Sequence, residues 1–149
     1  GHHRYLHSSP TRRSSDLQPI VPSIRRFYES GVPMLAICLG HQLLALATGA
    51  KTRRLKYGHR GVNHPVKDLV ADRVLITSQN HGYVVIDDTI DPLIAEISHI
   101  HLNDGSVEGL RYKEKPIISV QYHPEGAPGP QDSEYLFDDF LTLMRKRQR

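Results

Sequence analysis

The sequence predicts an α/β fold with an open, largely parallel sheet, flanking helices and a sharp turn that leads from one strand into a helix. Two apolar runs of strand length, VPMLAIC (32–38) and PIISVQY (116–122), support this prediction. Continuous apolar runs are typical of strands that a parallel sheet buries on both faces. The first run leads through a Leu-Gly step into a helical segment at 41–50. Strands that alternate with helices indicate layered α/β packing.

The first 17 residues, GHHRYLHSSPTRRSSDL, are expected to be a non-native or disordered arm. They are polar and show neither helical nor strand periodicity, and their histidines and arginines would be costly to bury. The piece PTRRSSDL (10–17) also resembles the translation of a common sequencing adapter. We therefore expect residues 18–149 to form one domain that is truncated on its N-terminal side.

Three elements are expected next along the chain. Residues 22–31 place Ile24, Phe27 and Tyr28 at helical spacing and end at Gly31, which predicts a short amphipathic helix. The buried strand at 32–38 follows it. HQLLALATGA (41–50) then contains good helix formers and reaches Gly49, a plausible C-cap.

Two further segments are predicted, one as a loop and one as a helix. YGHRGVNHPV (57–66) is rich in glycine and is expected to be a surface loop, either against a partner or framing the substrate site. SEYLFDDFLTLMRKR (133–147) predicts a packing helix, because its apolar residues recur at helical spacing and its last turn is basic. Ser133 is its candidate N-cap.

Composition excludes several classes of partner. The 149 residues carry a net charge of +3, and the basic excess lies largely at the two ends of the chain. No basic stripe interleaved with aromatic residues is found, so nucleic-acid binding is not expected. No apolar run approaches the roughly 18 residues of a membrane span, so no membrane association is expected either. The single cysteine cannot form an internal disulfide, which favours a reducing, cytoplasmic location.

That cysteine, Cys38, lies where the apolar strand meets the next helix. A residue on such a turn lies at the carboxyl edge of the sheet, where open α/β sheets bind ligands. The arrangement is that of a nucleophile elbow, and the amides of the helix N-terminus favour a thiolate. A buried, inert cysteine fits the same spacing, so the pattern alone leaves both interpretations open.

A nucleophilic cysteine needs a base, and His123 is the best candidate. It follows the second apolar strand, and Glu125 could orient its ring as the acid of a triad does. A buried core histidine is the alternative. We expect His99 and His101 on an exposed strand face. A zinc site is the competing explanation for a set of Cys and His, but no second Cys and no close ligand pair supports one, so no metal is expected.

AICLGHQ (36–42) together with SVQYHPE (119–125) resembles the class I, triad-type glutamine amidotransferases. The stretches KYGHRGVNHPVKD, ITSQNHGYVV and HPEGAPGPQDSEYLFDDF are similar to the small, glutaminase subunit of carbamoyl-phosphate synthase. The resemblance covers about Gln18 to Leu143 and implies hydrolysis of glutamine through a cysteine thioester. The anthranilate, GMP and CTP synthase amidotransferases are the runner-up members.

The resemblance implies a role for each matching residue. Cys38 would be the nucleophile, His123 the base and Glu125 its orienting acid. Glutamine would be bound by five residues, one of which supplies an oxyanion amide: Leu39 (the amide), Gln42, Asn80, Gly82 and Tyr83. Tyr83 stands where many relatives carry Phe. The family's second oxyanion donor comes from an upstream glycine-rich loop that this sequence lacks.

The resemblance also implies a partner. The ammonia would pass to a large subunit that uses ATP, bicarbonate and magnesium to make carbamoyl phosphate for arginine and pyrimidine synthesis, and the chain itself would need no cofactor. Two other classes remain open from the sequence. A different cysteine hydrolase could use the same elbow, and an inactive or purely binding fragment could keep the motifs without the activity.

Overall fold

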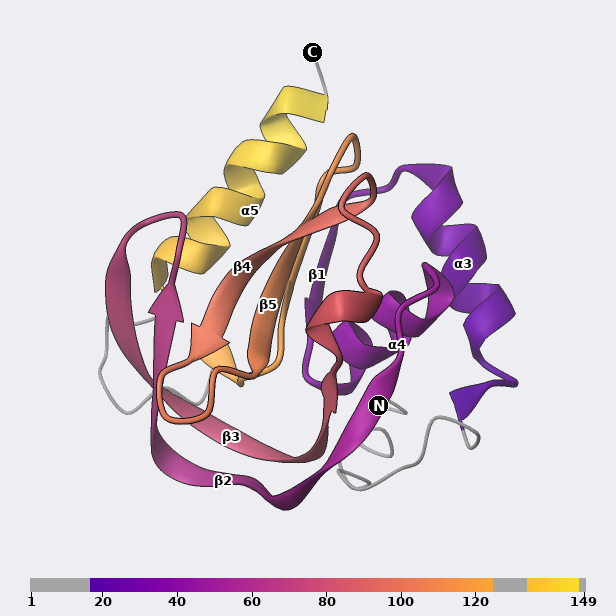
Figure 1. The fold of residues 1–149 in the computed structure, drawn as a ribbon. Coiled ribbons are helices and arrows are strands. Elements are labelled where there is room, and N and C mark those ends of the chain that lie inside the picture. The colour runs from indigo at the N-terminus through magenta and orange to yellow at the C-terminus, as the bar shows by residue number, and fades with distance from the viewer. Residues whose placement is uncertain (1–16, 125–133, 148–149) are drawn as a thin grey trace, which may run out of the picture.

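The computed structural model describes residues 17–124 and 134–147. A six-stranded mixed sheet with the strand order β1-β6-β5-β4-β2-β3 lies at its centre (Figure 1). The elements are α3 (Val21–Ser30), β1 (Met34–Ile37), α4 (Leu39–Ala47), β2 (Thr52–Asp68), β3 (Arg73–Val85), the 3-10 helix η1 (Asp87–Thr89), β4 (Ala95–His101), β5 (Val107–Tyr112), β6 (Ile117–Val120) and α5 (Glu134–Arg147).

The predicted α/β class is confirmed, but the sheet contains less parallel pairing than expected. Only β1 and β6 pair in parallel among the described strands, whereas β2–β3, β2–β4, β4–β5 and β5–β6 are antiparallel. The segments between β4 and β5 and between β5 and β6 are short turns, and a short turn can join only antiparallel neighbours.

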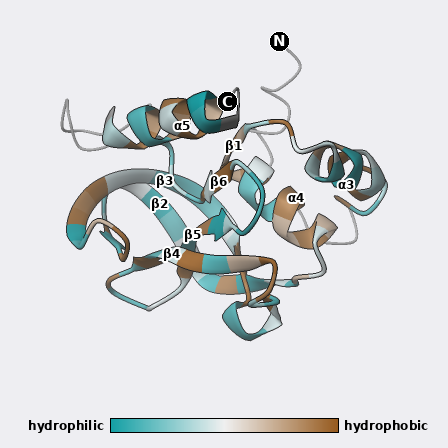
Figure 2. Cartoon of the chain, turned by 90° about the horizontal axis from the view of Figure 1, so that it is seen from above, coloured by the Kyte–Doolittle hydropathy of each residue, from teal (hydrophilic) through white to brown (hydrophobic). Residues whose placement is uncertain are grey.

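Helices cover both faces of the sheet at β1. Met34 and Ala36 pack against the core that contains Leu44 of α4, whereas Leu35 and Ile37 pack against the core that contains Leu136 of α5. Viewed from above, α5 and the pair α3 and α4 lie on different sides of the strands (Figure 2). The predicted burial of this strand on both faces is therefore only partial, because β1 is the edge strand and its residues stay half-buried.

The three predicted helices are all present. α3 ends at Gly31, which adopts φ 74° and donates its N–H to the Tyr28 carbonyl, as expected for a helix stop without a Cβ. The N-cap predicted at Ser133 lies outside the described residues. None of the described helices is long and apolar enough to cross a membrane. Leu17, assigned to the end of the arm from the sequence, is buried against Leu39 and Leu43.

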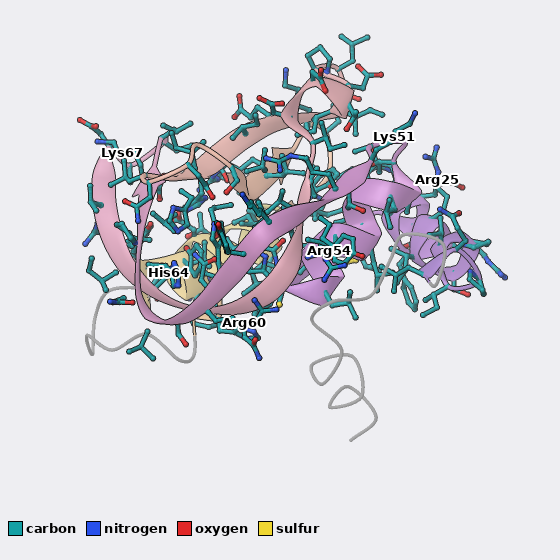
Figure 3. The ribbon with its side chains drawn as sticks, turned by 60° about the horizontal axis from the view of Figure 1, so that its bottom comes forward. Arg25, Lys51, Arg54, Arg60, His64 and Lys67 are labelled. Atoms are coloured by element: carbon teal, nitrogen blue, oxygen red, sulfur yellow. The ribbon has the colours of Figure 1, made fainter. Side chains whose placement is uncertain are left out.

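The segment 57–66 is not a loop, and that prediction is wrong. It belongs to the long strand β2, which pairs with β3 in a curled hairpin. Figure 3 shows Arg54, Arg60 and Lys67 along this strand. The register shifts between Arg54 and His59 coincide with Gly58, whose φ is 73° and whose missing Cβ would lie 2.9 Å from the His81 carbonyl oxygen. Glycine here marks a bulge within a strand.

The prediction that His99 and His101 are exposed is also wrong, because their exposed fractions are 1% and 2%. β4 lies inside the sheet between β5 and β2, and its register shifts around His99, so simple alternation does not describe it. His99 Nε2 lies 3.4 Å from the Asp68 carboxylate. This nearby carboxylate offsets the free-energy cost of burying the polar ring of His99.

His41 is fully buried in α4, and its Nδ1 lies 2.8 Å from Ser119 Oγ of β6. Burial lowers the pKa of His41 to about 3 from an ordinary value of 6.5. Between these two pH values His41 is protonated in the unfolded chain but neutral in the folded chain. This group therefore lowers the stability of the protein as the pH falls below 6.5.

We expect His41→Gln to flatten the dependence of the unfolding free energy on pH between about pH 6 and pH 4, by up to about 1.4 kcal/mol per pH unit. Urea unfolding at several pH values measures this slope. At pH 8 the ring is neutral in both states, so the difference between variant and wild type there gives the pH-independent cost of the substitution. Equal slopes for the two proteins would contradict the prediction.

Candidate functional site

The turn at Cys38 has the geometry of a nucleophile elbow. β1 ends at Ile37, and Cys38 is the N-cap of α4 with φ 55° and ψ −110°. A positive φ is uncommon for a residue with a Cβ, and such backbone strain concentrates at functional sites. The side chain is buried, with 6% of its surface exposed. The strand, sharp turn and helix predicted from the sequence are therefore confirmed.

Pairing between β1 and β6 brings the two motifs to one edge of the sheet. The Cys38 N–H donates to the Val120 carbonyl at 2.9 Å, which continues the parallel ladder past the end of β1. His123 follows Val120 by three residues, and its N–H donates to the Ser78 carbonyl at 3.0 Å. Cys38 and His123 thus follow the carboxyl ends of adjacent parallel strands. Glu125 lies outside the described residues.

Gln42 is buried rather than solvated, and protein groups use its amide. Its Nε2 donates to the Tyr83 carbonyl at 3.0 Å and to Gln121 Oε1 at 3.0 Å. Gln121 Nε2 in turn donates to Cys38 Sγ at 3.7 Å, and the Gln121 N–H donates to the Glu108 carbonyl at 2.8 Å. Both amide protons of Gln42 are therefore engaged, and a contact with a bound substrate would use its Oε1.

The other predicted glutamine contacts lie on β3 and at the start of α4. Asn80, Gly82 and Tyr83 belong to a strand, so the alternative that this segment is a turn is excluded. Asn80 is exposed, whereas Gly82 and Tyr83 are buried. Leu39 is the first residue of α4, and the first N–H groups of a helix have no acceptor within the helix. Its amide therefore lies at the same edge as Cys38.

Sequence reasoning missed Gln121 and His81. Gln121 stands two positions before His123 and directly after the mostly apolar strand β6, and this polar residue was the signal available for it. His81 lies inside QNHGY, a segment whose other residues carry the predicted contacts with glutamine. Its Nδ1 donates to the Tyr83 carbonyl at 2.9 Å, the same oxygen that Gln42 binds.

Ionisable groups gather on the other side of His81. His59 Nε2 donates to Asp104 Oδ2 at 2.7 Å, and Glu108 is fully buried nearby. Burial raises the pKa of Glu108 to about 7. Burial would also raise the pKa of Asp104, but hydrogen bonds from Ser106 and His59 outweigh it and lower that pKa to about 2. Burial lowers the pKa of His81 to about 3.

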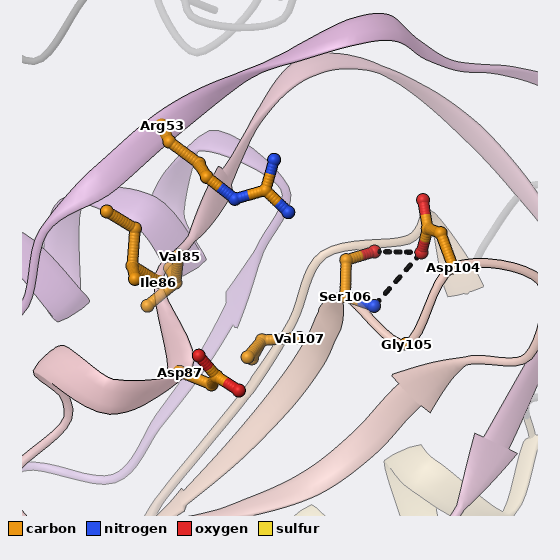
Figure 4. Close-up of a pocket in the computed structure, with 8 residues that line it drawn as sticks. All are labelled: Arg53, Val85, Ile86, Asp87, Asp104, Gly105, Ser106 and Val107. Atoms are coloured by element: carbon orange, nitrogen blue, oxygen red, sulfur yellow. Dashed lines mark hydrogen bonds between the residues drawn. The ribbon is translucent and has the colours of Figure 1, made fainter.

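A polar cavity of about 150 Å³ opens beside this group (Figure 4). Its wall contains Arg53, Asp87 and Asp104, and Asp104 Oδ1 accepts hydrogen bonds from the Ser106 N–H and hydroxyl. None of the described residues predicted to act on glutamine lines it. The cavity is therefore a feature separate from the Cys38 edge.

Comparison with known proteins agrees with this geometry. The model of the family "Glutamine amidotransferase class-I" matches residues 6–143. The carbamoyl phosphate synthase small chain of Staphylococcus epidermidis is 59% identical over 114 residues, which are 76% of this chain and 31% of that one. The corresponding chain of Clostridium perfringens is 62% identical over 109 residues, 73% of this chain and 30% of that one. The chain thus spans about a third of the length of these relatives.

Two solved structures share the fold. A putative GMP synthase protein from Thermoplasma acidophilum superimposes with a TM-score of 0.75 at 21% identity, covering 93% of this chain and 70% of that one. A glutamine amidotransferase from Thermotoga maritima gives a TM-score of 0.61 at 21% identity, covering 91% and 58%. With the elbow at Cys38 and the match across residues 6–143, these findings show that the chain belongs to the class-I glutamine amidotransferase family.

Proposed function

We propose that this chain is the catalytic part of the glutaminase subunit of a glutamine-dependent carbamoyl-phosphate synthase. The observation that carries the proposal is the strained Cys38 at the end of β1, beside the strand that leads to His123. The identity of 59% to a carbamoyl phosphate synthase small chain favours this member of the family. Another class I amidotransferase, a different cysteine hydrolase or an inactive fragment are the alternatives that the experiment below separates.

In the proposed reaction the Cys38 thiolate attacks the carboxamide carbon of glutamine. The electron pair moves to the carbonyl oxygen, and the Leu39 N–H at the start of α4 stabilises the resulting oxyanion. His123 takes the thiol proton and gives it to the departing nitrogen, so that ammonia leaves and a γ-glutamyl thioester remains. Water then hydrolyses the thioester to glutamate and restores the thiol. Glu125 is proposed to orient the His123 ring.

Binding of the substrate is assigned to the strand β3 and the first turn of α4. Asn80, Gly82 and Tyr83 would hold the amino-acid end of glutamine with Gln42. The chain from Gln42 through Gln121 to the Cys38 sulfur would position the thiol relative to that pocket. Gln121 is therefore proposed as a positioning residue.

The ammonia is proposed to pass to a large subunit. Free ammonia is mostly protonated at neutral pH and then has no nucleophilic electron pair, so its use requires a protected route to an acceptor. The acceptor chemistry, which consumes ATP and bicarbonate and uses magnesium, is assigned to that subunit.

Covalent labelling tests the proposal directly. The purified chain is treated with a diazo-keto analogue of glutamine, and mass spectrometry locates the adduct. We expect modification at Cys38 that excess glutamine suppresses and that excess asparagine does not. The same test on a chain extended to the length of its relatives controls for groups that this chain does not contain. If the extended chain is labelled indifferently to glutamine, or not at all, the proposed function fails; cleavage of esters or peptides would then favour a different hydrolase.

A further inference from the structure

Three buried side chains from three strands meet at the β2–β3 hairpin. His59 of β2, His81 of β3 and Glu108 of β5 have exposed fractions of 5%, 0% and 0%. His59 Nδ1 lies 3.2 Å from His81 Nε2 and 3.4 Å from Glu108 Oε2. His81 Nε2 lies 4.0 Å from Glu108 Oε2. These three atoms therefore surround one small space.

Neighbouring groups determine which nitrogen of each histidine carries the proton. His59 Nε2 lies 2.7 Å from Asp104 Oδ2, and His81 Nδ1 lies 2.9 Å from the Tyr83 carbonyl oxygen. A carboxylate and a carbonyl can only accept, so both of these nitrogens must donate. In neutral rings, His59 Nδ1 and His81 Nε2 then present lone pairs to each other.

Two oxygens add to this set of acceptors. Glu108 Oε1 accepts a hydrogen bond from Gln79 Nε2 at 3.0 Å, whereas Glu108 Oε2 is buried and accepts none within the described residues. The same orientation of the amide places Gln79 Oε1 2.7 Å from His81 Nε2. With Glu108 ionised and both rings neutral, lone pairs of His59 Nδ1, His81 Nε2 and Glu108 Oε2 face one buried space, and their repulsion is relieved by a proton or by a cation.

One added proton can bridge only one pair of these atoms at a time. Protonated His59 would donate through Nδ1 either to His81 Nε2 or to Glu108 Oε2, which lie 3.2 Å and 3.4 Å away. A divalent ion can accept lone pairs from His59 Nδ1, His81 Nε2 and Glu108 Oε2 together. Ligand atoms of a tetrahedral zinc ion lie about 3.3 Å apart, given bonds of about 2.0–2.1 Å, which is close to the two shorter separations here.

We propose that His59 Nδ1, His81 Nε2 and Glu108 Oε2 bind a zinc ion. Two imidazoles and one carboxylate are a donor set that zinc accepts. The Asp104 carboxylate behind His59 and the Tyr83 carbonyl behind His81 are outer partners of the kind that orient metal-bound histidines. The sequence pattern contains no sign of this site, because its ligands are separated by 22 and 27 positions along the chain (81 − 59 and 108 − 81).

His101 also places a ring nitrogen within 4.8 Å of the donor atoms of His59 and Glu108. Its own nitrogens are engaged, because Nδ1 accepts from the Asn103 N–H at 3.1 Å and Nε2 lies 3.1 Å from His64 Nδ1. We therefore assign it to the wall of the site, where its ring stacks on His59 with centroids 4.1 Å apart. Asp104 lines the cavity of Figure 4 and gives an ion a polar approach to His59.

The consequence of this site is structural. An ion held by β2, β3 and β5 would fix the hairpin to the sheet and hold His81 against the Tyr83 carbonyl. That carbonyl belongs to the segment proposed to contact glutamine, so the ion would stiffen the pocket without touching the substrate.

The test is metal binding by the purified protein, measured by isothermal titration with Zn²⁺ and by the visible absorption of bound Co²⁺. His2, His3 and His7 are first replaced by Asn in every protein tested, because clustered histidines bind these ions themselves. We expect one ion per chain with the intense bands of tetrahedral Co²⁺, and a rise in the thermal unfolding midpoint when zinc is present. Glu108→Gln keeps the shape and the bond from Gln79 and should weaken binding at least about 100-fold. His59→Gln and His81→Gln should do the same.

Two controls make the test specific. His64→Gln changes another histidine of β2 and should leave the affinity within about twofold. Cys38→Ser removes the only thiol and should bind the ion as tightly as the parent. The proposal is overturned if the folded parent binds no stoichiometric ion, if folded Glu108→Gln binds as tightly as the parent, or if Cys38→Ser abolishes binding.

Discussion

Cys38→Ser is expected to lower the rate of glutamine hydrolysis at least about 10³-fold, measured as ammonia release by the chain extended to the length of its relatives. A serine hydroxyl at this position is ionised far less readily than a thiol, and removal of a covalent nucleophile typically costs this much or more. Because the substitution changes one atom on a turn whose φ is 55°, the fold and the affinity for glutamine should persist.

Further variants test the same prediction and control for it. His123→Asn should cost a similar factor, and the double variant should be scarcely worse than either single one, because residues that act as a unit are not additive. Thr142→Ser is a matched small change on an exposed position of α5 and should leave the rate unchanged. A Cys38→Ser protein that retained more than a tenth of the activity would rule out Cys38 as the nucleophile.

Leu44→Ala is expected to lower the unfolding free energy by about 3 kcal/mol, within the 2–5 kcal/mol that buried leucines typically cost. Leu44 is 1% exposed and belongs to the core that joins α3 and α4 to the sheet. Truncation removes its apolar contacts and leaves a cavity beneath the helix that begins at Cys38. Urea unfolding followed by circular dichroism measures the loss.

The matched control is Leu141→Ala on α5, where the side chain is 42% exposed. The same atoms are removed, but little buried surface is lost, so we expect a change below about 1 kcal/mol. Equal losses for the two variants would mean that α4 is not packed on the sheet as described.

The local geometry around Cys38 could be predicted from the sequence because it depends on neighbours in the chain. An apolar run, a Leu-Gly step and a run of helix formers specify strand, turn and helix without reference to distant residues. The helices α3 and α5 were found for the same reason, since their apolar spacing is visible within one segment. The apolar character of both runs predicted β1 and β6 as strands of the sheet, whereas their parallel pairing with each other is seen only in the structure.

Predictions made from one segment at a time were wrong for β2 and for β4. Gly58 and the register shifts near His99 change which side chains face inward, and a bulge of this kind depends on the partner strand. The glycines of 57–66 therefore indicated a loop where the structure has a hairpin strand, and His99 and His101 were predicted to be exposed although they are buried.

The sequence by itself determined the family, the elbow at Cys38 and the motif that contains His123. Each of these is specified by residues that are contiguous in the chain. Only the tertiary structure decided that Gln42 reaches Cys38 through Gln121, and that His59, His81 and Glu108 share one buried space. Those contacts join residues far apart in the chain. Burial removes water from these polar atoms, so their hydrogen bonds and their pKa values depend on the protein groups around them.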